Sequence, residues 1–331
     1  MRNSRTSRLL TLPVVALAFA STCLLIFAAP VRASSIVIVP TFSSNITSDP
    51  NAVAIESAIN QTITFYESNI TTPITVDITY AEMSTGLGES NTFFGSITYS
   101  QYLAALQSHS SGDAVDTAAL ASLPAGPNNP VNGNTQMDLT TANLRALGFS
   151  NSTPTDSTIS INTAITNYTG GPAFSSSKYD LVSVIEHETD EALGLGSNLD
   201  TGSTAGPIRP EDLFRYSALG VRSYTTTSSA VSYFSINSGL TDLVGFNQVG
   251  PPGSSDYGDW VSSSTARVQD AFGTPGVTPI YGVEAVALDA IGYNYVQVTG
   301  VPEPSSFWLL SLGAIGFFAV RRTTKSVLAR A

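Results

Sequence analysis

The sequence has little cysteine, little charge and few histidines. Its only cysteine, Cys23, lies in an apolar N-terminal run, which excludes disulfides and thiol catalysis from the rest of the chain. Charged residues make up 12% of the sequence, and residues 34–299 hold six of the 14 lysines and arginines but 24 of the 25 acidic residues. Such a surface repels phosphate backbones, so we expect no nucleic-acid partner, whereas divalent cations are compatible with it.

Long apolar runs occur only near the two ends of the sequence. At the N-terminal end, three arginines precede an apolar run over residues 9–29, and Ala33 fits the small-residue rule for signal-peptide cleavage. We therefore expect a signal peptide over residues 1–33 and an exported protein. The alternative is an uncleaved membrane anchor, which would also export the chain.

The C-terminal run has a more specific arrangement. A Pro-Glu-Pro tripeptide at residues 302–304 is followed by an apolar segment over residues 307–320 and by the basic pair Arg321 and Arg322. The apolar segment is short for a transmembrane helix, which needs about 20 residues, and the trailing cations obey the positive-inside preference. This order over residues 300–331 resembles the PEP-CTERM sorting signal of Gram-negative bacteria.

The resemblance to a PEP-CTERM signal implies a partner and a location. A membrane sorting protease of the exosortase kind would remove the tail after a short transmembrane segment has anchored the protein transiently. The protein would then reside on the surface of the cell envelope or outside the cell. A plain C-terminal membrane anchor is the alternative.

Between the ends, residues 34–299 contain no obvious linker, so we expect one α+β domain. Hydrophobic periodicity predicts strands at residues 34–42, 73–83, 156–165, 220–226, 231–237 and 242–248. It predicts helices at residues 49–70, 98–109, 113–124, 140–149, 178–194 and 282–296.

The predicted helix over residues 178–194 carries the residues most suited to chemistry. His187 and Glu191 are one helical turn apart, so their side chains project together and could bind one metal ion. Glu188 is offset around the helix and could accept a proton from water at that metal without being a ligand. Two ligands one turn apart with a neighbouring carboxylate is the arrangement of His-Glu-x-x-His metalloproteases.

The sequence HETDEALGLGS resembles the metzincin motif His-Glu-x-x-His-x-x-Gly-x-x-His. His187, Glu188 and Gly194 match it, whereas Glu191 and Ser197 replace the second and third histidines. No methionine follows the motif, so the methionine turn of that family is missing. The resemblance implies a metzincin-like zinc-protease fold with a mixed sheet and a central active-site helix. It also implies a metalloendopeptidase acting on a peptide or protein.

A carboxylate at position 191 is compatible with zinc, although its charge could also favour Mn or Ca. The third ligand must come from elsewhere in the chain. Asp212 could supply it, and Tyr216 could donate a hydrogen bond to a developing oxyanion. The alternative is that Asp212 caps a helix and Tyr216 packs in the core.

Other acidic residues are weaker candidates for this site. Asp190 lies around the helix from Glu191, and Asp200 lies in a Gly/Ser/Asn-rich loop. In the segment SSDYGDW, Asp256, Asp259 and Trp260 suggest a calcium-binding turn, a substrate rim or a solvated turn.

The sequence therefore predicts an exported metal-dependent peptidase. In this interpretation the metal is held by His187, Glu191 and Asp212, Glu188 transfers the proton, and Tyr216 assists. The alternative is a catalytically inactive surface or biofilm-matrix protein that keeps the fold. Convergence of the site residues around one point would favour the enzyme, and a solvent-facing, isolated Glu191 would favour the inactive protein.

The two end segments predict processing of the exported protein. We expect a mature form that begins at about Ser34 and ends near the Pro-Glu-Pro motif, because both apolar runs belong to removable signals. Intact-mass measurement of protein recovered from the envelope or the medium checks this. A mature form that still contained Met1 or Ala331 would contradict it.

Overall fold

The structure, a computed structural model, describes residues 35–151, 153–250 and 256–296. The predicted signal peptide and the sorting tail, with its apolar segment at residues 307–320, lie outside the described residues. Among the helices of the described ranges, none is both long and apolar enough to cross a membrane.

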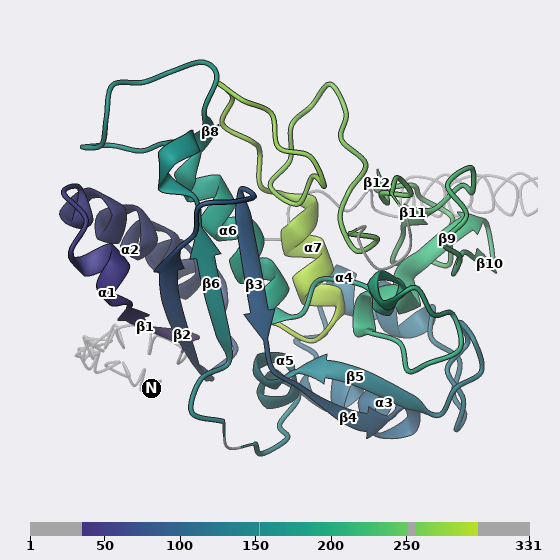
Figure 1. Ribbon diagram of the computed structural model, residues 1–331. Helices are drawn as coiled ribbons and strands as arrows, with labels where there is room; N and C mark the ends of the chain where they lie inside the picture. Colours follow the sequence, from purple (N-terminus) through teal and green to yellow (C-terminus); the bar gives the residue numbers. More distant parts are fainter. Residues whose placement is uncertain (1–34, 152, 251–255, 297–331) are drawn as a thin grey trace, which may run out of the picture. The chain divides into compact units, whose positions relative to one another are not determined.

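A mixed sheet of four strands forms one side of the domain (Figure 1). Its strands, in spatial order, are β1 (Val37–Phe42), β2 (Thr75–Glu82), β6 (Ser157–Ile161) and β3 (Gly88–Thr92). The first three are parallel, and β3 runs antiparallel to β6 at the edge. The three parallel strands were predicted from their periodicity, whereas the sequence of β3, GESNT, is polar and gave no signal.

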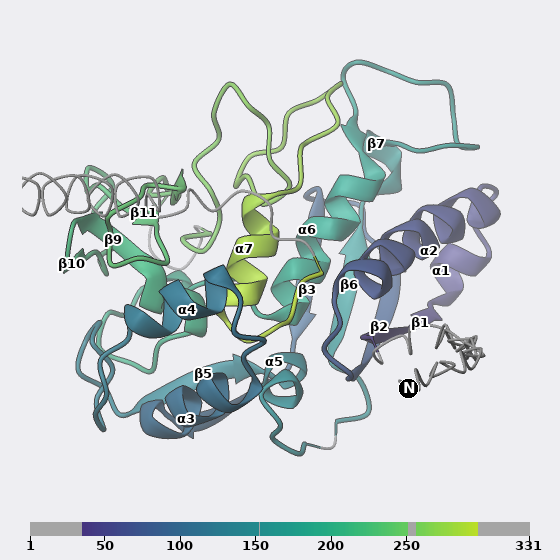
Figure 2. The ribbon, with the colours of Figure 1, turned by 180° about the vertical axis from the view of Figure 1, so that it is seen from behind.

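Two helices cover the same face of this sheet, as Figures 1 and 2 show from opposite sides. They are α2 (Ala52–Asn69) and α6 (Leu181–Leu193), and a four-residue helix, α1 (Ser44–Thr47), precedes them. The Tyr66 hydroxyl on α2 donates to the Asp190 carboxylate on α6 at 2.7 Å. This buried contact fixes α6 against α2, so the polar face of α6 turns away from α2.

The predicted central helix starts later and ends where expected. Asp180 caps α6 by accepting a hydrogen bond from the Ser183 N–H, so the helix begins at Leu181 rather than near residue 178. Gly194 ends it with φ of 132°, a backbone conformation that a side chain disfavours. Leu181 and Ile185 are fully buried and form the apolar face of the helix.

A second group of elements packs beside the sheet. Strands β4 (Phe94–Thr98) and β5 (Gln136–Thr140) pair antiparallel, next to α3 (Tyr99–His109), α4 (Ala114–Ala121) and α5 (Thr141–Ala146). The closing helix, α7 (Val283–Ala290), is buried between this group and α6, and it ends six residues before the predicted end at residue 296.

Short strands make up the later part of the chain. The pair β7 (Thr166–Asn167) and β8 (Tyr179–Asp180) leads into α6. A small sheet has the order β10-β9-β11-β12, with β9 (Arg215–Ala218), β10 (Val221–Arg222), β11 (Tyr233–Phe234) and β12 (Val244–Gly245). The three strands predicted here exist but are only two residues long. The fold class, α+β with a mixed sheet, is confirmed.

Candidate metal centre

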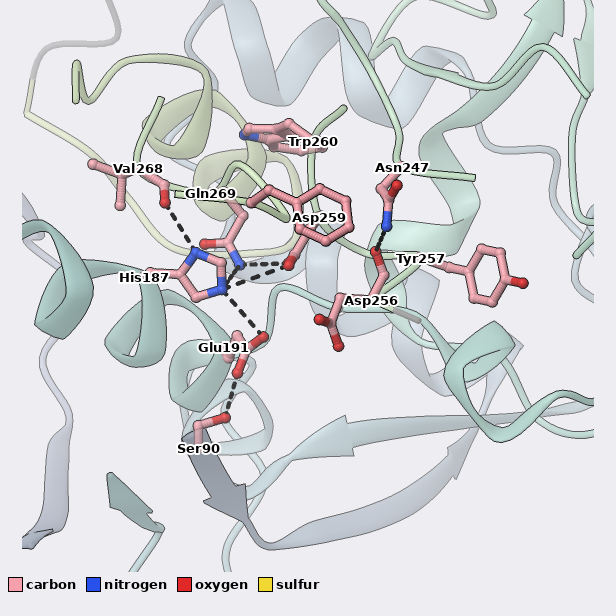
Figure 3. A network of polar contacts seen from close by, with 12 residues as sticks. Ser90, His187, Glu191, Asn247, Asp256, Tyr257, Asp259, Trp260, Val268 and Gln269 are labelled. Atoms are coloured by element: carbon pink, nitrogen blue, oxygen red, sulfur yellow. Dashed lines mark hydrogen bonds and ion pairs between the residues drawn. The ribbon is translucent and has the colours of Figure 1, made fainter. Parts of the chain in front are cut away.

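His187 is oriented by a backbone hydrogen bond. Its Nδ1 lies 2.9 Å from the carbonyl oxygen of Val268, which can only accept, so Nδ1 carries the proton. Nε2 then faces away from Val268, towards two carboxylates (Figure 3). Nε2 lies 3.6 Å from Glu191 Oε1 and 3.6 Å from Asp259 Oδ2. A hydrogen bond from the second ring nitrogen is the usual support of a metal-binding histidine.

The two carboxylates are supported in the same way. Ser90 Oγ donates to Glu191 Oε2 at 2.6 Å, and Gln269 Nε2 donates to Asp259 Oδ1 at 2.9 Å. Each carboxylate therefore has one oxygen held by a neighbour and the other directed towards His187, as Figure 3 shows. One candidate ligand atom from each of His187, Glu191 and Asp259 lies within 4.8 Å of the other two.

Asp259 is positioned by contacts between its loop and α7. The indole N–H of Trp260 donates to Glu284 Oε1 at 3.1 Å, and the backbone N–H of Gln269 donates to the same oxygen at 3.2 Å. Glu284 is fully buried in α7. These bonds place the segment around Asp259 opposite α6, although the two are more than 60 residues apart in the sequence.

The loop also approaches the end of α6 very closely. A methyl group at Gly258 would overlap the backbone of Gly196, so only glycine permits this approach. The position of Asp259 beside His187 thus depends on the residue that precedes it.

The carboxylates of this cluster repel one another and attract a protonated His187. Burial by itself lowers the pKa of His187, but Asp259, Glu191 and Glu188 outweigh it and raise that pKa well above its usual value. Burial, with the charge of Glu191 added, raises the pKa of Glu188 well above its usual value. A divalent cation among these groups would relieve the repulsion between the carboxylates.

The cluster lines two cavities that meet at Ser90, Glu191, Asp256 and Asp259, with volumes of about 390 Å³ and 170 Å³. The larger cavity runs along the start of β3. Its walls combine acidic groups with apolar side chains, among them Leu87, Tyr179, Val184, Val277 and Pro279.

Glu188 also faces the larger cavity. It is 6% exposed and lies directly against the backbone of β3, where a methyl group at Gly88 would overlap its carboxylate. Glycine at this position leaves room for the Glu188 side chain.

The structure brings together three of the five residues that the sequence suggested: His187, Glu188 and Glu191. Asp212 lies elsewhere, fully buried, where it accepts hydrogen bonds from Ser197 Oγ and from the N–H groups of Arg209 and Asn198. Through these bonds Asp212 stabilises the loop after α6. Burial raises the pKa of Asp212, and Arg215 partly offsets the effect.

Tyr216 is also away from the cluster. Its ring lies under the Arg222 guanidinium, 4.7 Å from it, and is buried in the small sheet at β9. It lines neither of the two cavities. The weaker candidates Asp190 and Asp200 bind the Tyr66 and Tyr281 hydroxyls and the Tyr257 N–H, respectively.

The sequence placed Asp259 only in a turn or substrate rim, and it gave no indication that Ser90 or Gln269 belongs to the site. The segment SSDYGDW carries two aspartates and a tryptophan, but nothing local to it points to α6. Ser90 lies in β3, which was not predicted, as β4, β5 and β9 were not. Only pairing across the fold brings these residues to His187.

Comparisons with known proteins give a match only for the C-terminal tail. The family described as "PEP-CTERM protein-sorting motif" matches residues 300–322. No curated protein and no solved structure gives a significant match. The motif marks the protein for export and sorting to the bacterial cell surface, with processing by exosortase at the C-terminus.

Proposed function

We propose that this surface-sorted protein is a metal-dependent peptidase with a metzincin-like fold, exported by a Gram-negative bacterium. The observation that carries the proposal is the set His187, Glu191 and Asp259, in which each side chain directs one atom to a common point while a neighbour holds its other atom. Metal ligands commonly have such support from a neighbour on the side away from the metal.

The proposed ligand set replaces Asp212 with Asp259. One imidazole and two carboxylates suit zinc, and the two negative charges also suit the harder ions Mn and Ca. When bound, such a metal acts as a Lewis acid and makes water a stronger nucleophile at neutral pH. Three protein ligands leave a position for water or substrate, as in catalytic zinc sites.

Glu188 is the proposed general base. It follows His187 on α6, is directed into the cavity against Gly88, and is not one of the three ligands. Its carboxylate would accept a proton from the attacking water and return it to the leaving amine. We assign Tyr216 no part in this reaction because it is remote from the cavity.

The edge strand β3 offers a way to bind substrate. It is last in the sheet order, and no described strand pairs with its outer edge. Residues 87–90 of this strand and its approach line the larger cavity. An extended peptide that paired with this edge would pass Glu188 and the proposed metal ligands.

One observation favours the alternative of a catalytically inactive surface protein. The Gln269 amide nitrogen lies 3.3 Å from His187 Nε2 and could donate to the lone pair that a metal needs. In that case Gln269 would replace the metal as the partner of His187. Metal analysis of the purified protein separates the two functions.

The ligand set predicts which variants lose metal. His187→Ala and Asp259→Ala should lose bound metal, because each removes one of three ligands, while Asp212→Asn should keep it. The measurement is metal content per folded chain by mass spectrometry, with circular dichroism as the check on folding. Loss of metal in Asp212→Asn but not in Asp259→Ala would restore Asp212 as the ligand, and equal content in all variants would exclude the site.

Glu188→Gln should separate metal binding from chemistry. The change keeps the side-chain volume and removes the proton acceptor, so metal content should stay constant while kcat/KM falls about 10²–10⁴-fold. The assay is hydrolysis of a peptide library with Zn, Mn or Ca supplied. Equal hydrolysis by wild type and variant, or none by either, would favour the inactive surface protein.

Gly88→Ala should impair catalysis through the position of Glu188. The added methyl group would force the Glu188 carboxylate to move, and displacement of a catalytic group by about 1 Å can cost roughly 10²-fold in rate. Gly206→Ala is the matched control, since nothing lies within 4 Å of its added methyl group. We expect unchanged metal content in both variants and reduced kcat/KM only in Gly88→Ala; equal activities would contradict the placement of Glu188.

A further inference from the structure

A second group of carboxylates lies away from His187, where α4 packs against α7. Asp113 precedes the first residue of α4, Asp116 lies in its first turn, and Asp289 lies in the last turn of α7. One carboxylate oxygen from each lies within 4.8 Å of the other two. Figures 1 and 2 show α4 and α7, far apart in the sequence, beside each other, and the three acidic side chains lie where they meet.

Asp289 is the member that most needs explanation. It is 0% exposed, and among the described residues neither of its carboxylate oxygens accepts a hydrogen bond of normal geometry, although burial raises its pKa and the nearby Tyr295 N–H lowers it. Burying an ionised carboxylate without a partner costs several kcal/mol, so buried carboxylates in folded proteins are paired or bind metals. Asp116 is also buried, at 2% exposed.

The hydrogen bonds of the other two aspartates leave oxygens available. Asp113 Oδ1 accepts from the Asp116 N–H at 3.0 Å and caps α4. Asp116 Oδ2 accepts from Ser111 Oγ at 2.8 Å and from the Gly112 N–H at 3.1 Å. The second oxygen of each side chain has no such donor among the described residues. These bonds fix both side chains before any ligand arrives.

Within the part of the chain that the structure describes, no lysine, arginine or histidine pairs with these three carboxylates. Among the described residues the salt bridges involve Arg145 and His187 only, and neither pairs with this cluster. Asp289 also lies at the C-terminal end of α7, where the helix dipole disfavours a negative charge and favours a positive one. Asp113 and Asp116 lie at the N-terminal end of α4, whose dipole instead favours negative charge, so the two helix ends oppose each other and a cation here would be stabilised by the carboxylates.

We propose that Asp113, Asp116 and Asp289 form a structural Ca²⁺ site that joins α4 to α7. The ligands are carboxylate oxygens alone, which calcium prefers and which suit zinc or copper poorly without nitrogen or sulfur. Export to the cell surface exposes the protein to external calcium, and extracellular calcium modules bind at about 10⁻⁴–10⁻³ M.

The proposed calcium site would support α7, the helix that positions Asp259 in the candidate metal centre. Asp289 ends α7, and Glu284 near its start holds Trp260 and Gln269, which flank Asp259 in space. Fixing the end of α7 to α4 would therefore stabilise the helix on which the Asp259 loop depends. This role requires no peptidase activity and is independent of the function proposed above.

A proton is the competing occupant. Burial, with the charges of Asp113 and Asp116 added, raises the pKa of Asp289 to about 9, so without a cation this carboxyl holds its proton at neutral pH. A protonated Asp289 needs no calcium, and its replacement by asparagine would then be harmless. Calcium and a proton therefore predict opposite results for Asp289→Asn: loss of the calcium effect in the first case and no change in the second.

The test is thermal unfolding of the chelator-treated protein with and without CaCl₂, at ionic strength matched with NaCl. We expect calcium at about tenfold its Kd to raise the Tm of wild type by roughly 3–6 °C. The same rise should occur in His187→Ala, which lacks the other candidate site. It should be absent in Asp289→Asn, which keeps the volume and removes the charge.

Asp113→Asn provides a second variant, because asparagine also caps helices and so preserves α4. Titration calorimetry should show calcium binding to this variant at least tenfold weaker than to wild type. This measurement does not depend on whether Asp289→Asn folds. No calcium-dependent rise in wild type would overturn the proposal in favour of the proton. An equal rise in wild type and in the Asp113→Asn variant would overturn it as well.

Discussion

The hydrogen bonds of Glu284 hold the candidate site in its arrangement. This fully buried carboxylate accepts from the Trp260 indole and the Gln269 N–H through one oxygen, and from the Gly282 N–H through the other. Trp260 is packed between Phe234 and Phe246, which belong to the small sheet and its flank. Through these contacts the loop that carries Asp259 is fixed to α7 and to the small sheet at once. These contacts direct Asp259 towards α6.

The end of α6 shows why Asp259, and not Asp212, lies beside His187. In the metzincin pattern the position of Ser197 would hold a histidine. Here Ser197 is buried and donates to Asp212, so the residue at the position of the third histidine binds the aspartate that the sequence suggested as a ligand. Both support the loop after α6. The space beside His187 is filled instead by the loop around Asp259, which Gly258 allows to pass close to Gly196.

Acidic residues outnumber lysines and arginines in residues 34–299, and this affects the interior of the protein as well as its surface. Buried carboxylates are satisfied in several ways in this protein. Asp156 pairs with Arg145, and Asp190 accepts from two tyrosines. Where neither a base nor enough donors are available, a cation or a proton is the remaining partner. The cluster of Asp113, Asp116 and Asp289 is such a place, whereas at the other proposed site His187, Ser90 and Gln269 share the charge of the carboxylates.

The sequence by itself determined the parts of this protein that local patterns encode. Apolar periodicity predicted β1, β2, β6 and the helices α2, α3, α4, α5 and α6, because each buries one face along a regular repeat. The spacing of His187 and Glu191 placed them side by side, since one turn of helix separates them whatever the rest of the fold does. The tail was identified from a contiguous motif.

Only the tertiary structure decided which residues meet. The edge strand β3 is polar, so its role follows from pairing with β6 and not from its own pattern. Long-range packing of Trp260 against Glu284 places Asp259, and not Asp212, beside His187. Asp289 lies near Asp113 because α7 packs on α4. Proximity in sequence favoured Asp212 as a ligand, but the hydrogen bonds of a folded loop gave it another place. Such contacts depend on the whole path of the chain, which no local spacing records.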